Sequence, residues 1–251
     1  MGAAKLRNVG LARALSKLGF CSRSRAFDLI RAGKVRVNRS LRRDPEYPVR
    51  IQTDRIEVEE RPVTAADRVY LVLNKPRGVL VTVSDEKGRA TVYASLSPHL
   101  PWVSPVGRLD KASEGLLVLT NDSEWSARIL APETHLTKTY HVQIKGDASE
   151  ACLKSIREGV RAKEGDILSA REVSWIRKGE RNAWLEIVLD EGRNRHIRRM
   201  LAALDIEVLR LMRTAIGPLA LGDLAKGSFR QLTAAEKHEL DRAMRDAKTK
   251  F

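Results

Sequence analysis

The sequence predicts an α+β protein in which a small basic domain precedes a larger domain with a mixed, mostly antiparallel sheet and flanking helices. Strand-like segments outnumber helix-like segments and connect in several styles, which is typical of α+β folds. Residues 1–43 contain 12 Lys and Arg residues and one acidic residue, whereas the segment EERPVTAADR at 59–68 lacks periodicity and indicates a linker. The predicted parts are a basic domain over 1–60, a linker over 61–68, a large domain over 69–235 and a charged tail over 236–251.

Positive charge is the feature of the composition that most narrows the function. The chain carries 46 Lys and Arg residues against 32 Asp and Glu residues, a formal net charge of +14, and residues 1–43 account for +11 of it. Such a concentration predicts a polyanionic partner, for example a nucleic acid. The alternative is a solvated basic surface that binds nothing.

Cysteine and histidine residues are sparse, which argues against several classes of protein. Cys21 and Cys152 are the two cysteines, and the five histidines show no ligand spacing. We therefore expect no disulfide framework, no metal site and no other cofactor. The chain has no apolar stretch long enough to span a bilayer and no signal-peptide core, so a cytoplasmic location without membrane contact is predicted.

The basic region predicts two short helices followed by small strands. The spacing of apolar residues indicates a helix over 11–18, and Gly19 follows it as a stop. Ser22 or Ser24 can cap a second helix. Alternating Val and basic residues then indicate a short strand over 35–37, and a second strand is expected at 55–58.

The large domain begins with a continuous apolar run at 69–73, which suits a central strand. Further strands are expected at 79–83, 115–120, 138–145, 172–176 and 183–190. Helices are expected at 123–130, 149–158 and 194–204. The charged tail predicts a terminal helix.

A charged tripeptide, Arg108-Leu109-Asp110, lies close to the apolar run LLVL at 116–119. Gly107 permits a tight turn at this point, so that Asp110 can lie at the rim of the sheet. Two interpretations are open. Asp110 caps a turn, as an Asp before a strand commonly does, or its carboxylate performs chemistry beside a dry apolar wall that residues 116–119 supply.

The arginine-rich segment EGRNRHIRRML predicts a helix capped by Asn194. Arg198 lies at the edge of the apolar face of that helix, where its guanidinium can reach into a cleft while its stem packs. Such a group keeps a nearby carboxylate ionised, and it typically lowers the carboxyl pKa by about 1–3 units. Arg195 and Arg199 are expected to point away from the apolar face, toward solvent or a polyanion, and His196 to lie on the helix surface.

A third segment, KTYHVQIKG, places Tyr140, Val142 and Ile144 on one face of a strand. An inward tyrosine is usually a core residue. Near an RNA-binding cleft it can instead stack on an extruded base, which contributes about 1–3 kcal/mol per base.

These segments together resemble one family, the bacterial ribosomal-RNA pseudouridine synthases with an N-terminal S4 RNA-binding domain. The segment LARALSKLGFCSRSRAFDLIRAGKVRVN resembles the S4 domain. Five further motifs follow in the order of the family: NKPRGVL at 74–80, PVGRLDKASEGLLVLTND at 105–122, KTYHVQIKG at 138–146, EGRNRHIRRML at 191–201 and RLMRTAIGPLALGDLAKGSFRQLT at 210–233. Five motifs in family order behind an S4 domain are a specific signal.

The resemblance implies roles for individual residues. Asp110 matches the catalytic aspartate, Tyr140 matches the tyrosine that stacks on the target base and serves in proton transfer, and Arg198 matches the basic residue paired with the aspartate. RNA contacts are implied for Arg23, Arg25, Arg31, Lys34, Lys75, Arg77, Arg108, Arg193, Arg195 and Arg199. His196 departs from the family pattern, in which Gln or Glu is common at this position.

The implied activity is the isomerisation of uridine to pseudouridine in ribosomal RNA, with base flipping, cleavage of the C1′–N1 bond and reattachment of uracil through C5. The aspartate can attack C1′, attack C6 or remove a proton from the sugar, and the sequence does not choose among these routes. We expect the substrate to be large-subunit RNA, because the segment GRNR at 192–195 resembles the large-subunit members of the family more than the small-subunit members.

Two other functions compete with this one. A non-catalytic ribosome- or RNA-binding protein would use the basic N-terminal domain alone. A nuclease or other hydrolase would need paired carboxylates or metal ligands, which the sequence lacks. The expected partner is ribosomal RNA or a ribosomal-subunit assembly intermediate, and the protein is expected to be a monomer.

Overall fold

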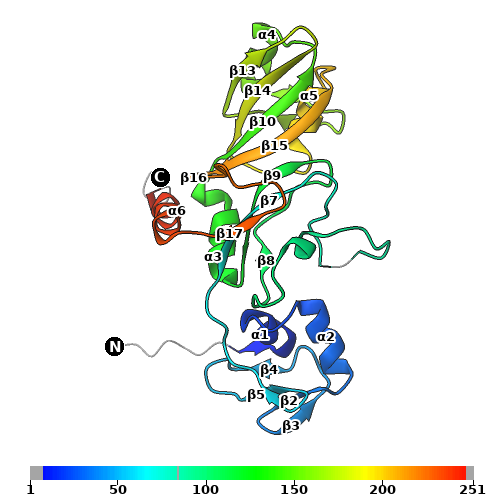
Figure 1. The fold of residues 1–251 in the computed structure, drawn as a ribbon, viewed down its shortest axis with the longest axis vertical. Helices are drawn as coiled ribbons and strands as arrows, with labels where there is room; N and C mark the ends of the chain where they lie inside the picture. The colour runs from blue at the N-terminus through cyan, green and yellow to red at the C-terminus, as the bar shows by residue number, and fades with distance from the viewer. Residues whose placement is uncertain (1–7, 84, 247–251) are drawn as a thin grey trace. The chain divides into compact units, whose positions relative to one another are not determined.

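The computed structural model describes residues 8–83 and 85–246, whose contacts separate into two compact units (Figure 1). Within the described residues, the first unit extends to Tyr70 and includes the segments 97–104 and 119–124. The second unit consists of the other described residues from Leu71 onward. The domain boundaries expected from the sequence remain predictions.

The first unit is built from two short helices and small antiparallel strands. Its helices are α1 (Leu11–Lys17) and α2 (Arg23–Arg31). Its strands are β1 (Val9–Gly10), β2 (Val35–Val37), β3 (Ser40–Arg42), β4 (Pro48–Val49), β5 (Ile56–Val58) and β6 (Arg61–Pro62). Four of these strands pair in the order β3-β2-β5-β6, and β1 pairs with β4. Both expected helices and both expected strands are confirmed, apart from single residues at their ends.

Local chemistry determines where α2 begins. The Ser22 hydroxyl oxygen accepts a hydrogen bond of 3.1 Å from the backbone N–H of Arg25, so Ser22 is the N-cap. The apolar faces of α1 and α2 pack with β2, and Leu15, Ile30 and Val35 are among their fully buried residues. Because this face is apolar, the arginines of α2 are left on the outer surface.

The second unit is organised around a nine-stranded sheet. Its strands are β7 (Tyr70–Lys75), β8 (Ser104–Pro105), β9 (Glu114–Thr120), β10 (Lys138–Lys145), β13 (Glu172–Lys178), β14 (Asn182–Leu189), β15 (Val208–Ile216), β16 (Leu219–Ala220) and β17 (Phe229–Gln231). Their order is β13-β14-β10-β15-β9-β7-β17, with β16 beside β15 and β8 beside β9. The β15–β9 pair is parallel, whereas β10–β14, β10–β15, β13–β14 and β17–β7 are antiparallel. The predicted α+β fold with a mixed, mostly antiparallel sheet is confirmed.

Helices and short turns complete the fold. They are the 3-10 helices η1 (Val92–Ser95) and η2 (Pro132–Thr134), the α-helices α3 (Ser123–Leu130), α4 (Glu150–Glu158), α5 (His196–Ala202) and α6 (Ala234–Asp246), and the short strand pair β11 (Val160–Arg161) and β12 (Ile167–Leu168). The expected helices of the large domain are present, and the end of the expected terminal helix, residues 247–251, lies outside the described residues. In the part of the chain that the structure describes, no helix is long and apolar enough to cross a membrane.

One face of the sheet carries the main hydrophobic core. Buried residues alternate with half-buried ones along β14, as expected for a strand with one covered face. The covered face packs against α4 and α5, whose buried residues include Ile156 and Met200. Tyr140 of β10 packs against this core and lies opposite Arg213 of β15 in the register.

The structure lacks one expected strand and contains several that were not expected, of which β15 is the longest. Residues 79–83, expected to form a strand, contribute only the isolated bridge between Leu80 and Thr91. Their β-branched residues have no neighbouring strand to pair with, and Val83 is exposed. Conversely, β15 was not expected, because two of its side chains are arginines that interrupt the apolar alternation.

The start of α5 also differs. Its N-cap is Arg195 rather than Asn194, and Arg195 adopts a left-handed backbone conformation with φ 48°. This turn directs the Arg195 side chain away from the helix axis and into the cleft formed by β10, β15 and the turn before β9.

A capping box starts α6 and provides a test of the fold. The Thr233 hydroxyl accepts a hydrogen bond from the Glu236 N–H, and the Glu236 carboxylate accepts one from the Thr233 N–H. Hydrogen bonds from Arg230 lower the pKa of Glu236 to about 2. A depressed carboxyl pKa stabilises the folded state above the unfolded-state pKa, and that stabilisation is lost as the pH falls toward 2.

We therefore expect Glu236→Gln to lower the free energy of unfolding at pH 7 by about 1–2 kcal/mol. The difference from wild type should shrink as the pH falls from 4.5 to about 2. Urea unfolding at pH 7 and pH 3 measures it, with Glu239→Gln, an exposed position on the same helix, as the control. An equal loss at both pH values would contradict the assigned role of the carboxylate.

Candidate active site

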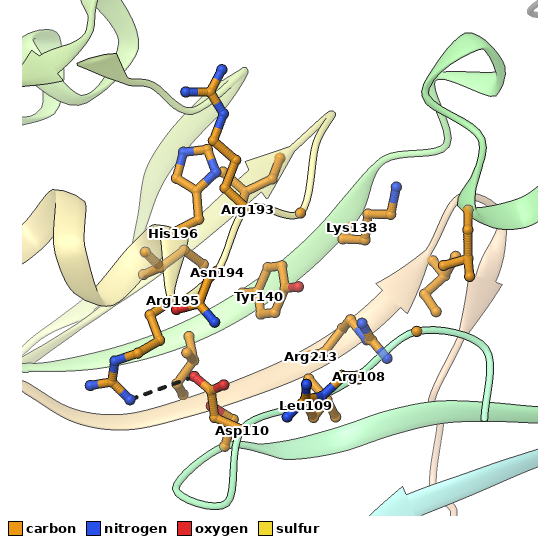
Figure 2. Close-up of a pocket in the computed structure, with 18 of the residues that line it drawn as sticks. Arg108, Leu109, Asp110, Lys138, Tyr140, Arg193, Asn194, Arg195, His196 and Arg213 are labelled. Atoms are coloured by element: carbon orange, nitrogen blue, oxygen red, sulfur yellow. Dashed lines mark ion pairs between the residues drawn. The ribbon is translucent and has the colours of Figure 1, made fainter. Parts of the chain in front are cut away.

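A cleft of about 410 Å³ opens in the second unit (Figure 2). Its polar lining comes mainly from the turn before β9, strand β10, the turn before α5 and strand β15. These segments are far apart in the sequence and meet because β10 lies between β14 and β15 in the sheet. Asp110 and Tyr140, the predicted catalytic aspartate and stacking tyrosine, both line the cleft.

The loop that carries the aspartate is held by its backbone carbonyls. We call residues 110–113 the aspartate loop. The Lys111 carbonyl accepts a hydrogen bond of 2.7 Å from the Gly78 N–H, and the Asp110 carbonyl accepts one of 3.0 Å from the Ser113 N–H. The carbonyls of Ala112 and Ser113 accept hydrogen bonds from side chains. All four carbonyls of the loop are therefore satisfied, which restricts where the Asp110 side chain can lie.

Lys75 is one of these side-chain donors. Its ammonium group donates to the carbonyls of Ser113 at 2.7 Å and Pro76 at 2.9 Å, and the residue is 0% exposed. Burial lowers the pKa of Lys75 to about 8, although the charges of Glu114 and Asp110 oppose this shift. The expected RNA contact of Lys75 is therefore revised, because a fully buried ammonium group supports the loop and does not reach a phosphate.

Arg198 is the second side-chain donor. Its guanidinium donates to the Ala112 carbonyl at 3.2 Å and to the Val208 carbonyl at 3.4 Å. Burial lowers the pKa of Arg198, and the nearby charge of Arg195 lowers it further, whereas the charge of Asp110 raises it. Arg198 thus acts on Asp110 through the backbone of the aspartate loop and through its field.

The ion pair of Asp110 is made by Arg195. The two side chains are 3.7 Å apart and point toward each other in Figure 2. Arg195 was expected to point away from the apolar face of the helix, and its left-handed backbone is the reason that it turns into the cleft instead. The side chains of Arg195 and Asp110 are 52% and 36% exposed, so solvent screens this pair and its contribution to stability is small.

The apolar side chains around Asp110 are not those of residues 116–119, as was expected. Residues 116–119 are completely buried inside the sheet and do not line the cleft. The cleft is lined instead by apolar side chains from several elements: Val106, Leu109, Ile129, Leu130, Leu189, Ile197, Leu211 and Ile216. The expectation that residues 116–119 supply the wall is wrong, because β9 is an interior strand of the sheet with both faces covered.

His196 is buried, contrary to the expectation of a surface position. It is 3% exposed and lines the cleft at the first turn of α5. Burial lowers the pKa of His196, and the charge of Glu191 partly opposes this shift. The physical reason is helical spacing, because His196 lies four residues before Met200 and therefore shares the buried face of α5.

Apart from Lys75 and Arg199, the residues predicted to contact RNA lie in or near the cleft or on the first unit. Arg108, Arg193 and Arg195 line the cleft, and Arg77 is exposed nearby, donating to the Leu209 carbonyl. In the first unit, the exposed members are Arg23, Arg25, Arg31 and Lys34.

Arg199 differs from these groups. Its side chain is 17% exposed and forms ion pairs with Glu164 and Asp166 at 3.0 and 2.5 Å. The RNA contact expected of Arg199 stays a prediction, and it would require the guanidinium to leave these two carboxylates.

Sequence reasoning missed two cleft residues, Lys138 and Arg213. The signal that could have found them is the alternation in β10 and β15, which places each on the face that carries Tyr140. No group of three His, Cys, Asp or Glu side chains within residues 8–83 and 85–246 is placed to hold a metal ion.

Comparison with known proteins identifies the family. Residues 69–203 match the family model described as RNA pseudouridylate synthase, and residues 9–69 match the S4 domain model. The chain belongs to the RNA pseudouridylate synthase family. It is therefore an enzyme that isomerises uridine in RNA, and its basic N-terminal region is an S4 domain.

Several relatives align over nearly the whole chain. An uncharacterized RNA pseudouridine synthase of Aquifex aeolicus is 35% identical, with 95% of this chain and 96% of the relative covered. The ribosomal large subunit pseudouridine synthase B of Bacillus subtilis is also 35% identical, with 94% and 96% covered. A crystal structure of a pseudouridylate synthase superposes with a TM-score of 0.64 at 29% identity and covers 92% of this chain and 99% of that one.

The donor role of Lys75 leads to a prediction. Lys75→Met leaves the Ser113 and Pro76 carbonyls without this donor, and a buried polar group that loses its partner costs about 1–3 kcal/mol. We expect a loss of stability of this size in urea unfolding, together with faster amide hydrogen exchange in the aspartate loop. Lys111→Met, an exposed position in the same loop, is the control. Unchanged exchange in the loop would show that Lys75 does not hold it.

Proposed function

We propose that the substrate is a uridine in large-subunit ribosomal RNA and that the Asp110 carboxylate initiates its isomerisation. The observation that carries this proposal is that Asp110 and Tyr140, 30 positions apart in the sequence, line one cleft together with Arg195. The preference for large-subunit RNA is supported by the relative in Bacillus subtilis, whose name states that substrate class.

The geometry supports a division of roles in the cleft. Asp110 supplies the carboxylate, Tyr140 provides a flat apolar surface for the flipped uracil, and Arg198 positions the aspartate loop through the Ala112 carbonyl. The ion pair with Arg195 places a positive charge beside the Asp110 carboxylate, the group that all three chemical routes use. Attack on C1′, attack on C6 and proton removal from the sugar all remain compatible with this arrangement.

The basic residues of the S4 domain are proposed to bind the RNA that flanks the target uridine. Arg23 and Arg25 are exposed on the first turn of α2, and Arg31 is exposed at its end. Phosphate contacts of this kind contribute affinity without reading sequence, so the choice of uridine falls to the cleft and to the shape of the RNA. The substrate is either free ribosomal RNA or a subunit assembly intermediate.

The proposed active form is a monomer in the cytoplasm. The cleft is formed by residues of one chain, so a second copy is not needed to complete it. Cys21 and Cys152 are free thiols, as is typical of a reducing compartment.

Release of tritium from RNA labelled at uracil C5 tests the activity, because C5 loses its hydrogen when it bonds to C1′. We expect wild-type protein to release tritium from unmodified large-subunit ribosomal RNA, and Asp110→Asn to reduce the rate by at least about 10³-fold. Asp205→Asn, an exposed position outside the cleft, should retain the rate. Equal release by wild type and Asp110→Asn would exclude Asp110 from the chemistry.

The role of the S4 arginines predicts a change in salt dependence. Replacing Arg23 and Arg25 together by Gln removes up to two phosphate interactions, and each should reduce the slope of log K against log salt by about 0.7–0.9. Filter binding between about 50 and 300 mM salt measures the slope, and Arg242→Gln, an exposed position on α6, serves as the control. An unchanged slope would remove these arginines from the RNA interface.

A further inference from the structure

Arg213 is the most deeply buried cation in the lining of the cleft. It is 5% exposed and lies on β15, where its Nε donates to the Leu116 carbonyl at 2.8 Å. Its Nη2 is buried and has no hydrogen-bond partner among the described residues. A buried guanidinium that makes only some of its hydrogen bonds lowers the stability of the fold, so its position in the cleft needs a physical explanation.

The backbone around Arg213 leaves the side chain little freedom. Gly115 of β9 pairs with Arg213, and a Cβ at Gly115 would lie 2.3 Å from the Arg213 carbonyl oxygen. Gly115 has a φ of +100°, a conformation that side-chain-bearing residues rarely adopt. β9 and β15 therefore approach each other closely at this point, and the hydrogen bond to Leu116 holds the guanidinium there.

Lys138 is a second cation near Arg213. Among the described residues no carboxylate forms an ion pair with Arg213, whereas Asp110 is engaged by Arg195. Lys138 also lines the cleft, and its pKa is lowered by burial and then by the charge of Arg213, while Asp190 raises it. Two cations near each other in a sheltered place favour a ligand that carries or acquires negative charge.

Tyr140 relates this pair of cations to the substrate. Tyr140 and Arg213 are directly opposite each other on adjacent antiparallel strands, and both side chains lie on the face that lines the cleft. Figure 2 shows Tyr140 between Lys138 and the turn that carries Arg195, with Arg213 on the neighbouring strand. A uracil stacked on Tyr140 would therefore have an edge close to Arg213.

The reaction places negative charge on the uracil. When the C1′–N1 bond breaks, its electron pair stays on N1 and is delocalised to O2 and O4. If the carboxylate adds to C6 instead, the C5–C6 π electrons move onto O4. The negative charge is consumed when C5 bonds to C1′; C5 then loses its proton while N1 gains one, so neutral pseudouridine results, and in the C6 route the carboxylate also leaves C6. Each of these two routes thus creates an oxyanion on the base, and a fixed, desolvated donor stabilises such a charge most effectively.

We propose that Arg213, supported by Lys138, binds a carbonyl oxygen of the flipped uracil and stabilises the negative charge that develops on the base. This inference rests on the proposed function and adds a catalytic residue to it. A phosphate of the RNA backbone is the competing ligand. Arg213 lies on the sheet that forms the floor of the cleft, where the base edge is expected, and a phosphate is better hydrated at the mouth.

Single-turnover kinetics on a short RNA that contains the unmodified target uridine tests this proposal. We expect Arg213→Gln to slow the chemical step by about 10²–10³-fold. Arg213→Lys keeps the charge and should recover part of the rate. Arg177→Gln, an exposed arginine of β13 outside the cleft lining, should match wild type. Thermal unfolding of each variant separates these effects from loss of the fold.

Sulfur substitution at the uracil identifies the contact. Replacing O2 or O4 by sulfur weakens that atom as a hydrogen-bond acceptor. At the oxygen that Arg213 contacts, the substitution should slow wild type by about 10-fold more than it slows Arg213→Gln. The proposal would be overturned if sulfur at O2 and sulfur at O4 each slowed Arg213→Gln by the same factor as wild type. It would also be overturned if Arg213→Gln reacted as fast as wild type.

An abasic residue at the target position distinguishes the two ligands. If Arg213 contacts uracil, Arg213→Gln should bind abasic RNA as tightly as wild type does. An equal loss of affinity for uridine and abasic RNA would identify a phosphate contact and overturn the proposal. Inactivity of the wild type on every ribosomal RNA form would contradict the proposed function, and this inference would fall with it.

Discussion

The arrangement of the cleft depends on the hydrogen bonds that hold residues 110–113. Each carbonyl of this aspartate loop has its own donor, and two of the donors, Lys75 and Arg198, come from strand β7 and helix α5. Because these elements pack in the core of the second unit, their donors hold the backbone of the loop in one position. Asp110 can then be about one-third exposed, open to substrate, without being free to move.

Arg198 was expected both to reach into the cleft and to pair with Asp110, and the structure divides these two roles between Arg198 and Arg195. Arg198 is half-buried and fixes the backbone, whereas Arg195 at the exposed helix start faces the carboxylate directly. The buried position suits a group that must not move. The exposed position suits a group that can exchange its partner when RNA enters, because a screened ion pair at 3.7 Å costs little to break.

Much of the fold followed from sequence patterns, and the failures have identifiable causes. The apolar alternation of β10 and β14 and the Ser22 cap of α2 are local signals, so these elements were predicted correctly. Strand β15 was missed because Arg213 occupies an inward position that only the cleft explains. Asp110 and Tyr140 were placed in one site by resemblance to a family, since no local pattern reports that β10 lies within reach of the aspartate loop. The position of Arg195 depended on a left-handed residue at the helix start, which no sequence pattern indicated. The burial of His196 follows from its place four residues before Met200 and could have been predicted.

The central claim is that this cleft converts one uridine of large-subunit ribosomal RNA, with Asp110 as the essential carboxylate. The most direct measurement is to map pseudouridine along ribosomal RNA by carbodiimide modification and primer extension after incubation with the protein. The account predicts a new stop at one position in large-subunit RNA with wild type, and no stop with an Asp110→Asn protein that binds the same RNA with equal affinity. A stop at that position with Asp110→Asn, or stops only in small-subunit RNA with wild type, would contradict it.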